Sequence, residues 1–429
     1  MDTEVIYCDD NLHRLALLPP NSVNLIYLDP PFFSNRYYEV IWGDEAEVRS
    51  FEDRWEGGIH HYVSWMKERV LEMRRVLNPK GSFYLHCDWH ASHYLKQMLD
   101  DVFGINQFRN EIVWAYKTGG TSKRYFARKH DTILFYVKSN DYTFNPQKDK
   151  SYVRTLPEPH TLSGKRLGIK MDEVGHKYRY VIARDVWEIE PIYRNKPEHL
   201  GYPTQKPEEL LGRIIEASSN KDDIVLDPFA GCGTSIVVSE RLGRHWIGID
   251  ISPTACNLMK RRLAKVGTTN IKLVGMPTTI EDLKKLKPFE FQNWIVDRIN
   301  GIQSNKQVGD MGIDGWTWML HDPIQIKQSE GIGREVVDKF ETAMERVKKT
   351  NGFIIAFSFT RGTYEEVARI KNGLTIHLIK VQDILDNIDA IYSQMGITAG
   401  LPDFANVPMP QINVRAHSAE ELLESQRTA

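Results

Sequence analysis

A strand-like run that ends in a glycine-rich turn constrains the fold of this chain more than any other segment. Residues 222–235 read DDIVLDPFAGCGTS, in which an apolar run leads to Gly231 and Gly233 and then to a helical pattern. Glycines at this place let the backbone approach a ligand closely at the carboxyl edge of an open α/β sheet. A phosphate-binding loop would continue with Lys after its last glycine, whereas Thr follows Gly233. We therefore expect a ligand other than a nucleoside triphosphate.

The next strand-like run, HWIGID, ends in a carboxylate at Asp250. Asp250 lies 23 residues after Asp227, the aspartate that ends the preceding run. At that separation, a carboxylate at the end of the neighbouring strand can accept hydrogen bonds from both hydroxyls of a ribose. The two strand ends favour an adenosine-type cofactor; the alternative is a tight turn in which Asp250 only caps a helix.

A third apolar run, at residues 25–28, ends in the letters DPPF, which are Asp29, Pro30, Pro31 and Phe32. Two prolines cannot continue a strand ladder, so they end the strand and stiffen the loop. Such a loop suits chemistry on the exocyclic amine of a nucleobase, because the Asp29 carboxylate and the Pro30 carbonyl can accept its two N–H bonds while Phe32 stacks on the ring. The alternative is a strand-ending turn with a core phenylalanine.

Strand and helix patterns alternate before and after a loop-rich segment, which predicts an α/β fold with a parallel sheet. Between residues 110 and 200 the alternation stops, and Gly, Pro, Lys and Arg accumulate around one convincing strand at 131–139. We therefore divide the chain into 1–109 and 201–277 as the two halves of one domain, 110–200 as an insert, 278–287 as a linker, 288–395 as a second α/β domain and 396–429 as a tail.

Composition and charge exclude several classes of protein. The chain has 429 residues, and no apolar run approaches the roughly 18 residues of a membrane span. The N-terminal letters MDTEVIYCDD carry acids where a secretory signal needs basic and apolar residues. Four scattered cysteines fit a reducing compartment, and the net charge of -2 means that nucleic-acid binding must come from local basic clusters. We expect a cytoplasmic protein with no membrane partner.

Together these motifs resemble a known family, the amino-directed DNA methyltransferases of the permuted β group. The resemblance covers about residues 7–274 and rests on CDDNLHRLALLPPNSVNLIYLDPPF at 8–32, TQKP at 204–207 and DPFAGCGTS at 227–235. It implies a doubly wound, Rossmann-like sheet that binds S-adenosylmethionine, with 110–200 as a DNA-recognition insert.

The resemblance also assigns roles to residues. It implies catalysis by Asp29, Pro30, Pro31 and Phe32, and cofactor contacts from Asp10, Thr204, Lys206, Asp227, Phe229, Gly231, Gly233 and Asp250. Because Cys8 stands in place of the family's usual Gly, Asp9 remains an alternative to Asp10.

The base that this enzyme modifies is expected to be adenine, at N6, because cytosine members of the resembled family more often carry Ser at the position of Asp29. The target base must leave the duplex to reach the loop. Alternatives are the N4 amine of cytosine, an RNA substrate, or a regulator that only binds the cofactor.

A histidine-rich segment, YLHCDWHASH at residues 84–93, raises the question of a zinc site. Zinc is disfavoured because strand-end and helix residues would have to converge without a second ligand set. The resembled family has a similar stretch beside its catalytic pocket, which implies that His86 and Asp88 shape the base or cofactor site.

Basic and aromatic side chains alternate in residues 109–130. Basic residues bind phosphates and aromatic rings stack on bases, which favours contact with double-stranded DNA over a merely solvated loop. The DNA-binding candidates are Lys117, Lys123, Arg124, Arg128 and Lys129.

The C-terminal segment carries a second set of chemical groups. Asp314 lies in GDMGIDGW, while Gln325 and Lys327 share one face of the strand DPIQIKQS. Oxygen ligands and a lysine in this order suit Mg²⁺-dependent cleavage of DNA. The stretch resembles the Mrr-type restriction-endonuclease fold, whose positions Asp310, Asp314, Gln325 and Lys327 match.

The resemblance implies metal ligands at Asp314 and Gln325 and catalysis by Asp314 and Lys327. The alternative is a domain that only binds DNA. The sequence leaves open whether the protein forms a homodimer.

Overall fold

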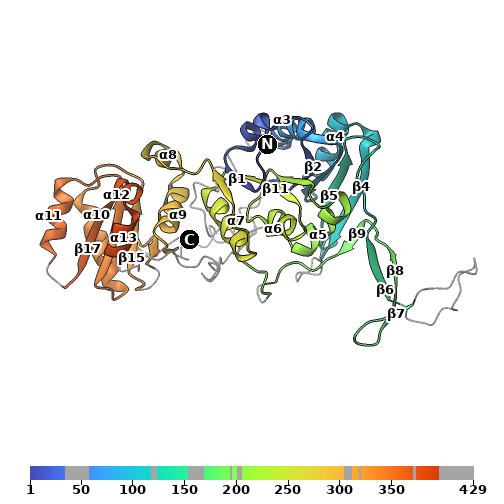
Figure 1. Cartoon of the computed structure of the whole chain (residues 1–429). Helices are drawn as coiled ribbons and strands as arrows, with labels where there is room; N and C mark the ends of the chain where they lie inside the picture. The colour runs from blue at the N-terminus through green and yellow to red at the C-terminus, as the bar shows by residue number, and fades with distance from the viewer. Residues whose placement is uncertain are drawn as a thin grey trace, which may run out of the picture.

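The computed structural model of the chain describes residues 1–33, 58–116, 123–152, 169–193, 196–200, 205–303, 312–317, 320–370 and 373–395. Lys117, Thr204, Asp310 and the expected tail lie outside these ranges. Within them the chain forms two α/β bodies, one running from blue to yellow and one from golden yellow to red in Figure 1. None of the described helices combines the length and apolarity needed to cross a membrane.

The described part of the first body contains a nine-stranded sheet in the order β12-β1-β11-β10-β2-β3-β5-β4-β9. The strands from β12 to β3 are mutually parallel, β5 is antiparallel to both β3 and β4, and β9 is parallel to β4. Their bounds are β1 (Val5–Cys8), β2 (Val23–Leu28), β3 (Leu77–Cys87), β4 (Phe108–Ala115), β5 (His130–Val137), β9 (Val186–Glu188), β10 (Ile224–Asp227), β11 (His245–Asp250) and β12 (Lys272–Val274).

This sheet confirms the predicted fold class. The parallel strands β10 and β11, from the second half of the domain, lie between β1 and β2 from the first half. Consequently the residues that follow β1, β2, β3, β10 and β11 meet at one edge of the sheet. Strands β4, β5 and β9 fall within or across the expected insert at 110–200, so that segment contributes to the main sheet as well as to a separate extension.

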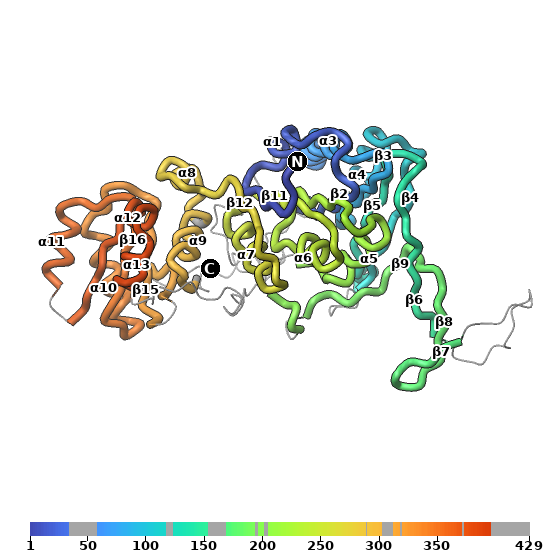
Figure 2. The backbone as a smooth tube through the Cα atoms, viewed as in Figure 1, coloured from blue at the N-terminus to red at the C-terminus, as the bar shows by residue number. Residues whose placement is uncertain are grey.

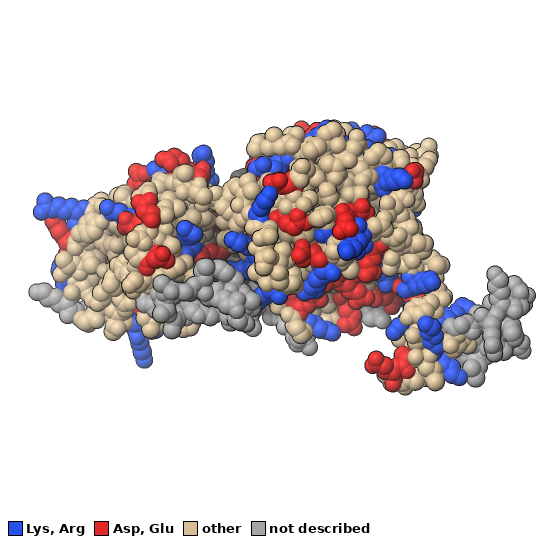
Figure 3. Space-filling view, in the orientation of Figure 1, with Lys and Arg blue, Asp and Glu red and all other residues tan. Residues whose placement is uncertain are grey.

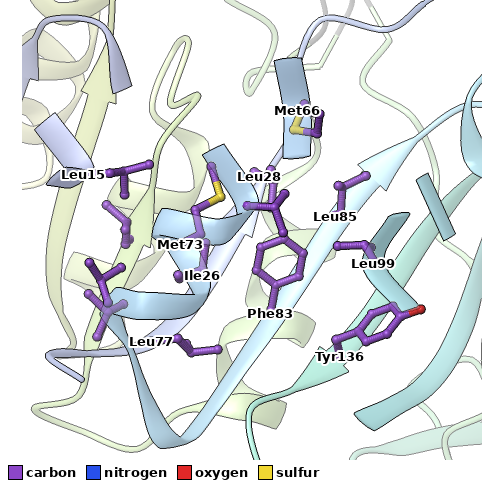
Figure 4. Close-up of a cluster of buried hydrophobic side chains, with 14 of the residues drawn as sticks. Leu15, Ile26, Leu28, Met66, Met73, Leu77, Phe83, Leu85, Leu99 and Tyr136 are labelled. Atoms are coloured by element: carbon purple, nitrogen blue, oxygen red, sulfur yellow. The ribbon is translucent and has the colours of Figure 1, made fainter. Parts of the chain in front are cut away.

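Helices cover both faces of the sheet, as parallel strands require. One face carries α1 (Asn11–Leu17), α3 (Gly58–Val76) and α4 (Ser92–Phe103), and the other carries α5 (Glu208–Ser218), α6 (Thr234–Arg241) and α7 (Pro253–Lys265). Alternation along β2 divides its side chains between the faces: Ile26 and Leu28 pack with Met66 and Met73 of α3 (Figure 4), while Leu25 and Tyr27 pack toward α5. The short 3₁₀ helix η1 (Ile105–Gln107) links α4 to β4.

An arm extends from the edge of the sheet at β9 (Figure 2). It consists of β6 (Lys148–Tyr152), β7 (Lys170–Met171) and β8 (Lys177–Ile182), which form a three-stranded antiparallel sheet in the order β6-β8-β7. Figure 3 shows Lys and Arg side chains along this arm and acidic side chains at its visible tip.

The second body has a five-stranded sheet in the order β13-β14-β15-β16-β17 among the described residues. The strands are β13 (Ile302–Gln303), β14 (Gly315–Trp316), β15 (Pro323–Lys327), β16 (Asn351–Ala356) and β17 (Thr375–Lys380). Helices α9 (Pro288–Arg298), α12 (Val381–Asp386) and α13 (Ile388–Gln394) pack on one face, and α10 (Arg334–Arg346) and α11 (Arg361–Arg369) on the other.

The two bodies meet through helices rather than through a bare linker. The expected linker at 278–287 contains α8 (Ile280–Lys285), whose Leu283 is fully buried in the second core. Asp297 of α9 is 3.6 Å from Arg261 of α7 and accepts a 3.5 Å hydrogen bond from Asn257. Burial raises the pKa of Asp297, although Arg261 and Asn257 oppose that effect.

Candidate active sites

The DPPF loop follows β2 at the carboxyl edge of the large sheet, where its aspartate meets a lysine. Lys206 forms an ion pair with Oδ2 of Asp29, and their side chains are 9% and 15% exposed. The Nζ atom of Lys206 also lies 5.2 Å from the ring centroid of Phe32. The sequence implied a cofactor contact for Lys206, and the structure places it against the expected catalytic carboxylate.

A buried histidine supports the aromatic ring of this loop. His86 lies at the end of β3 with its ring centroid 5.8 Å from that of Phe32. Its Nδ1 is 3.0 Å from the Tyr27 hydroxyl, and its Nε2 is 3.3 Å from Oδ2 of Asp131. These contacts hold the imidazole from both sides, so it packs against Phe32 in a fixed orientation.

Asp131 holds His86 in place, and the sequence analysis did not predict this residue. Burial alone would raise the pKa of Asp131, but hydrogen bonds from His86 and Tyr116 and the nearby Lys206 ammonium lower it below its ordinary value. The Tyr116 hydroxyl donates to Oδ1 of Asp131 at 3.2 Å. Asp131 comes from β5, which runs antiparallel to β3, so no local pattern indicates that the two strands bring it to His86.

The glycine turn after β10 is held by Asp227. Its carboxylate accepts hydrogen bonds from the Ser235 hydroxyl and from the backbone N–H of Phe229, the latter at 3.0 Å. Burial, with a smaller contribution from the carboxylates of Asp29 and Asp250, raises the pKa of Asp227 to about 7, while these hydrogen bonds oppose the shift. Asp227 is therefore a buried residue that stabilises the conformation of the glycine turn through these hydrogen bonds.

The two glycines have positive φ angles, 51° at Gly231 and 74° at Gly233. A Cβ atom at Gly233 would lie 2.4 Å from Cγ of Met259 in α7, which leaves no room for a side chain. The positive φ angles favour glycine at both positions, and the contact with Met259 requires it at Gly233.

Asp250 anchors this turn from the end of β11. Its Oδ2 accepts the Gly231 N–H at 2.8 Å, and its Oδ1 accepts the Ser252 N–H at 2.9 Å. Desolvation raises the pKa of Asp250 despite these bonds. Each carboxylate oxygen has a further lone pair that can accept a hydrogen bond, which fits the two hydroxyl donors of the ribose of an adenosine-type cofactor.

Asp9 and Asp10, the alternative cofactor contacts, have different partners in the structure. Asp10 caps α1 by accepting the Leu12 N–H at 2.8 Å and pairs with the buried Arg69 at 3.0 Å, whereas Asp9 pairs with His13 and Arg14. Arg69 lies 4.0 Å from the Trp65 ring centroid, and Trp65 lies 5.8 Å from that of Phe229. A chain of contacts thus connects Asp10 to the glycine turn.

In the second body, Asp314 and the strand β15 form the other candidate site. Oδ2 of Asp314 accepts the Ile326 N–H at 2.6 Å, and its Oδ1 accepts a 3.2 Å bond from Gln292 of α9. Gln325 is buried, and its Oε1 has no hydrogen-bond partner among the described residues. Lys327 is half-buried at the end of the same strand.

Gln325 reaches the loop that carries Asp314. A Cβ atom at Gly312, where φ is 96°, would lie 2.7 Å from Nε2 of Gln325. Amide and carboxylate oxygens are ligands that a hard cation takes, and the Gln325 oxygen is buried without a partner among the described residues, so these residue types fit Mg²⁺. In the part of the chain that the structure describes, no group of three His, Cys, Asp or Glu side chains is arranged to hold a metal ion.

With both sites in place, comparison with known proteins identifies the chain. Residues 23–261 match the family described as DNA methylase. The chain belongs to this family. The sequence-based resemblance is therefore confirmed, and this DNA methylase is a methyltransferase of restriction-modification systems. Its residues 283–388 match a second family, described as restriction endonuclease.

The proteins that resemble this DNA methylase include several DNA methyltransferases. It is 31% identical to the DNA adenine methyltransferase YhdJ of Escherichia coli (strain K12), over 61% of this chain and 83% of the relative. It is also 31% identical to the type II methyltransferase M.HpaI of Haemophilus parainfluenzae, over 72% of this chain and 88% of the relative. Among solved structures, the cytosine-N4-specific PvuII DNA methyltransferase is 19% identical, with a TM-score of 0.42 over 62% of this chain and 90% of its own.

The expected DNA-binding residues of the methylase lie just before β5. Lys123, Arg124 and Arg128 are exposed, and Lys129 is half-buried. The Arg128 guanidinium lies 3.6 Å from the ring centroid of Trp89, a residue that the sequence analysis did not single out. This basic segment is therefore attached to the loop that follows β3.

Proposed function

We propose that the DNA methylase transfers a methyl group from S-adenosylmethionine to the exocyclic amine of a base extruded from double-stranded DNA, with adenine N6 preferred. The observation that carries this proposal is the convergence of Asp29, Phe32 and the Asp250-anchored turn at one edge of the sheet. An acceptor, a stacking ring and a nucleoside-binding carboxylate are the three parts that this reaction needs.

The loop residues have distinct tasks in this proposal. Lys206 occupies Oδ2 of Asp29, so we assign Oδ1 and the Pro30 carbonyl to the two amine hydrogens. Holding both hydrogens favours a pyramidal nitrogen whose lone pair can attack the methyl carbon. The nitrogen–carbon bond forms as the carbon–sulfur bond breaks, and the amine proton then leaves to the Asp29 carboxylate. Pro31 stiffens the loop, and Phe32 stacks on the base above His86.

The cofactor site is assigned to residues around the glycine turn. When bound, S-adenosylmethionine supplies an electrophilic methyl group on a sulfonium sulfur. Asp250 would bind the ribose hydroxyls, and Gly231 and Gly233 allow close backbone approach. Asp227 keeps the turn in shape, and Phe229 and the Asp10–Arg69 pair form its outer wall.

Adenine is favoured as the target by the aspartate at position 29 and by the name of the E. coli relative, a DNA adenine methyltransferase. The test is to express the methylase in a host that lacks DNA methylation and to sequence its DNA with detection of modified bases. We expect N6-methyladenine at one recognition sequence, and none when Asp29→Ala is expressed. Methylcytosine alone would overturn the choice of base, and unmodified DNA would overturn the proposal.

A second activity, Mg²⁺-dependent cleavage of DNA, is favoured by the buried amide oxygen of Gln325, which has no partner in the described part of the chain and whose side chain reaches the loop at Gly312 that leads to Asp314. Asp314 and Gln325 would hold the cation, which activates water and stabilises charge on the phosphate. Lys327, on the same strand face as Gln325, would lie beside the scissile phosphate. The test is incubation of the purified methylase with Mg²⁺ and DNA that carries its recognition sequence, methylated or not. If both substrates stay intact, the domain only binds DNA.

A further inference from the structure

The side chain of Phe126 is 98% exposed, the largest exposed fraction of any large apolar side chain among the described residues. Its neighbour Tyr125 is 62% exposed. Leaving a phenyl ring in water is unfavourable, so an exposed aromatic pair on a folded surface indicates a binding partner.

Phe126 lies close along the chain to Asp131, which belongs to the surroundings of the catalytic loop. It stands five positions before Asp131 (131 minus 126), and Asp131 contacts His86, which packs against Phe32. Because β5 is antiparallel to β3, the start of β5 lies at the edge of the sheet where β3 ends. The segment 123–129 therefore borders the site proposed for the extruded base.

Two contacts fix the backbone next to Phe126. The Arg128 guanidinium stacks 3.6 Å from the Trp89 ring centroid, and the Trp89 ring in turn lies 3.6 Å from that of His90. His90 is held 2.6 Å from Asp88, directly after β3. The Lys129 carbonyl accepts the Tyr116 N–H at 3.0 Å, so the segment is attached on its C-terminal side to two parts of the sheet.

The basic residues around Phe126 favour a nucleic-acid partner. Residues 123–129 contain four basic side chains, at Lys123, Arg124, Arg128 and Lys129, and no acidic one. Phosphates of duplex DNA complement such a segment. An apolar ring surrounded by phosphate-binding side chains suits insertion between base pairs, where the ring stacks and the cations contact the backbone.

We propose that Phe126 is a positioning residue that inserts into the duplex beside the target and stacks on the bases that border the gap left by extrusion. This inference rests on the proposed function, because it supplies the stacking that the duplex loses when the base leaves. Phe126 touches neither the reacting amine nor the cofactor in this role. Its effect should depend on whether the target base is paired.

The test uses the full-length methylase and two duplexes that carry the recognition sequence mapped in host DNA. In one the target base is paired, and in the other it lies opposite an abasic position and is already free to leave the stack. Single-turnover methylation is measured for wild type, Phe126→Ala and Phe126→Trp. Phe144→Ala serves as a matched control, because Phe144 is the half-exposed phenylalanine that follows β5 at the opposite edge.

On the paired duplex, Phe126→Ala should slow methylation about 5- to 150-fold, the range of one lost stacking contact. Phe126→Trp should restore most of the rate, and Phe144→Ala should match wild type. On the abasic duplex, Phe126→Ala should approach the wild-type rate. Equal loss on both duplexes, or no loss on either, would overturn the role of Phe126.

A second measurement separates this inference from the proposed function. With 2-aminopurine at the target position, the wild type should raise its fluorescence through unstacking, and Phe126→Ala should reduce that rise. A wild type that methylates DNA without any rise would contradict base extrusion, and with it the role of Phe126. A wild type with a normal rise that Phe126→Ala shares would contradict the role of Phe126 alone.

Discussion

Lys206 forms an ion pair with the carboxylate of Asp29, a residue 177 positions earlier in the chain. Both side chains are largely withdrawn from water, and Lys206 precedes α5, on the far side of the insert. The second half of the domain therefore places a cation on the carboxylate of the first half. Removing one partner from such a pair leaves a poorly solvated charge, which is costly.

Asp29→Ala should abolish methyl transfer while leaving the affinity for S-adenosylmethionine within about twofold. The substitution removes the acceptor for the amine but no contact of the glycine turn. Tritium transfer to DNA and calorimetric titration of the cofactor measure the two effects separately. Parallel loss of cofactor binding would instead place Asp29 in the cofactor site.

Lys206→Met distinguishes the two roles considered for this lysine. Its ion pair with Asp29 predicts a loss of turnover of about tenfold or more, because a buried charge-assisted bond is worth roughly 1.5–3 kcal/mol. Cofactor affinity should change much less than in Asp250→Asn, which serves as the comparison. A larger change in cofactor affinity than in turnover would instead support Lys206 as a cofactor contact, the role implied by the family resemblance.

Asp250→Ala should weaken binding of S-adenosylmethionine at least about tenfold, because it removes the ribose acceptor and frees the Gly231 and Ser252 N–H groups. Calorimetry gives the affinity, and circular dichroism checks that the domain is folded. Gly231→Val is a poorer test, since φ is 51° at that glycine and a β-branched residue is strained there. Unchanged affinity in folded Asp250→Ala would remove the turn from the cofactor site.

The pKa of Asp227, about 7 in the folded protein, predicts how stability depends on pH. An unfolded aspartate has a pKa near 3.9, so between about pH 4 and pH 7 the native state binds more protons than the unfolded state. Asp227 therefore lowers the free energy of unfolding as pH rises through that window. Asp227→Asn mimics the protonated carboxyl and should reduce this decline, as measured by urea unfolding at pH 5 and pH 8. An identical pH dependence in wild type and variant would contradict the assignment.

Two substitutions in β15 test the second site. Lys327→Ala should eliminate Mg²⁺-dependent cleavage while methylation continues, because the sites lie in different bodies. Gln325→Leu should also abolish cleavage but raise the free energy of unfolding by about 1 kcal/mol, since it removes a buried oxygen that lacks a partner. Agarose gels and thermal denaturation provide the readouts. Persistent cleavage in both variants would exclude this site.

The sequence predicted the parts of the site that depend on adjacent residues. Two consecutive prolines at 30 and 31 end the strand locally, and the positive φ angles at Gly231 and Gly233 favour glycine. The contacts of Asp131 with His86 and of Gln292 with Asp314 were not predicted, because each joins separate elements and neither residue stands out in its own segment. The same holds for β9, a three-residue strand that is defined only by pairing with β4.

The order of strands in the large sheet has a consequence for synthesis of the protein. Strands β11 and β10 separate β1 from β2, and Val225 pairs with Leu25, 200 positions earlier (225 minus 25). A nascent chain that has emerged only as far as the insert thus exposes two strands whose inner neighbours have not been translated. Open strand edges recruit other chains, and long-range pairing is slow. Ribosome stalling within the insert should therefore cause aggregation or engage chaperones, and the yield of native enzyme should depend on translation speed more than on the stability of the finished fold.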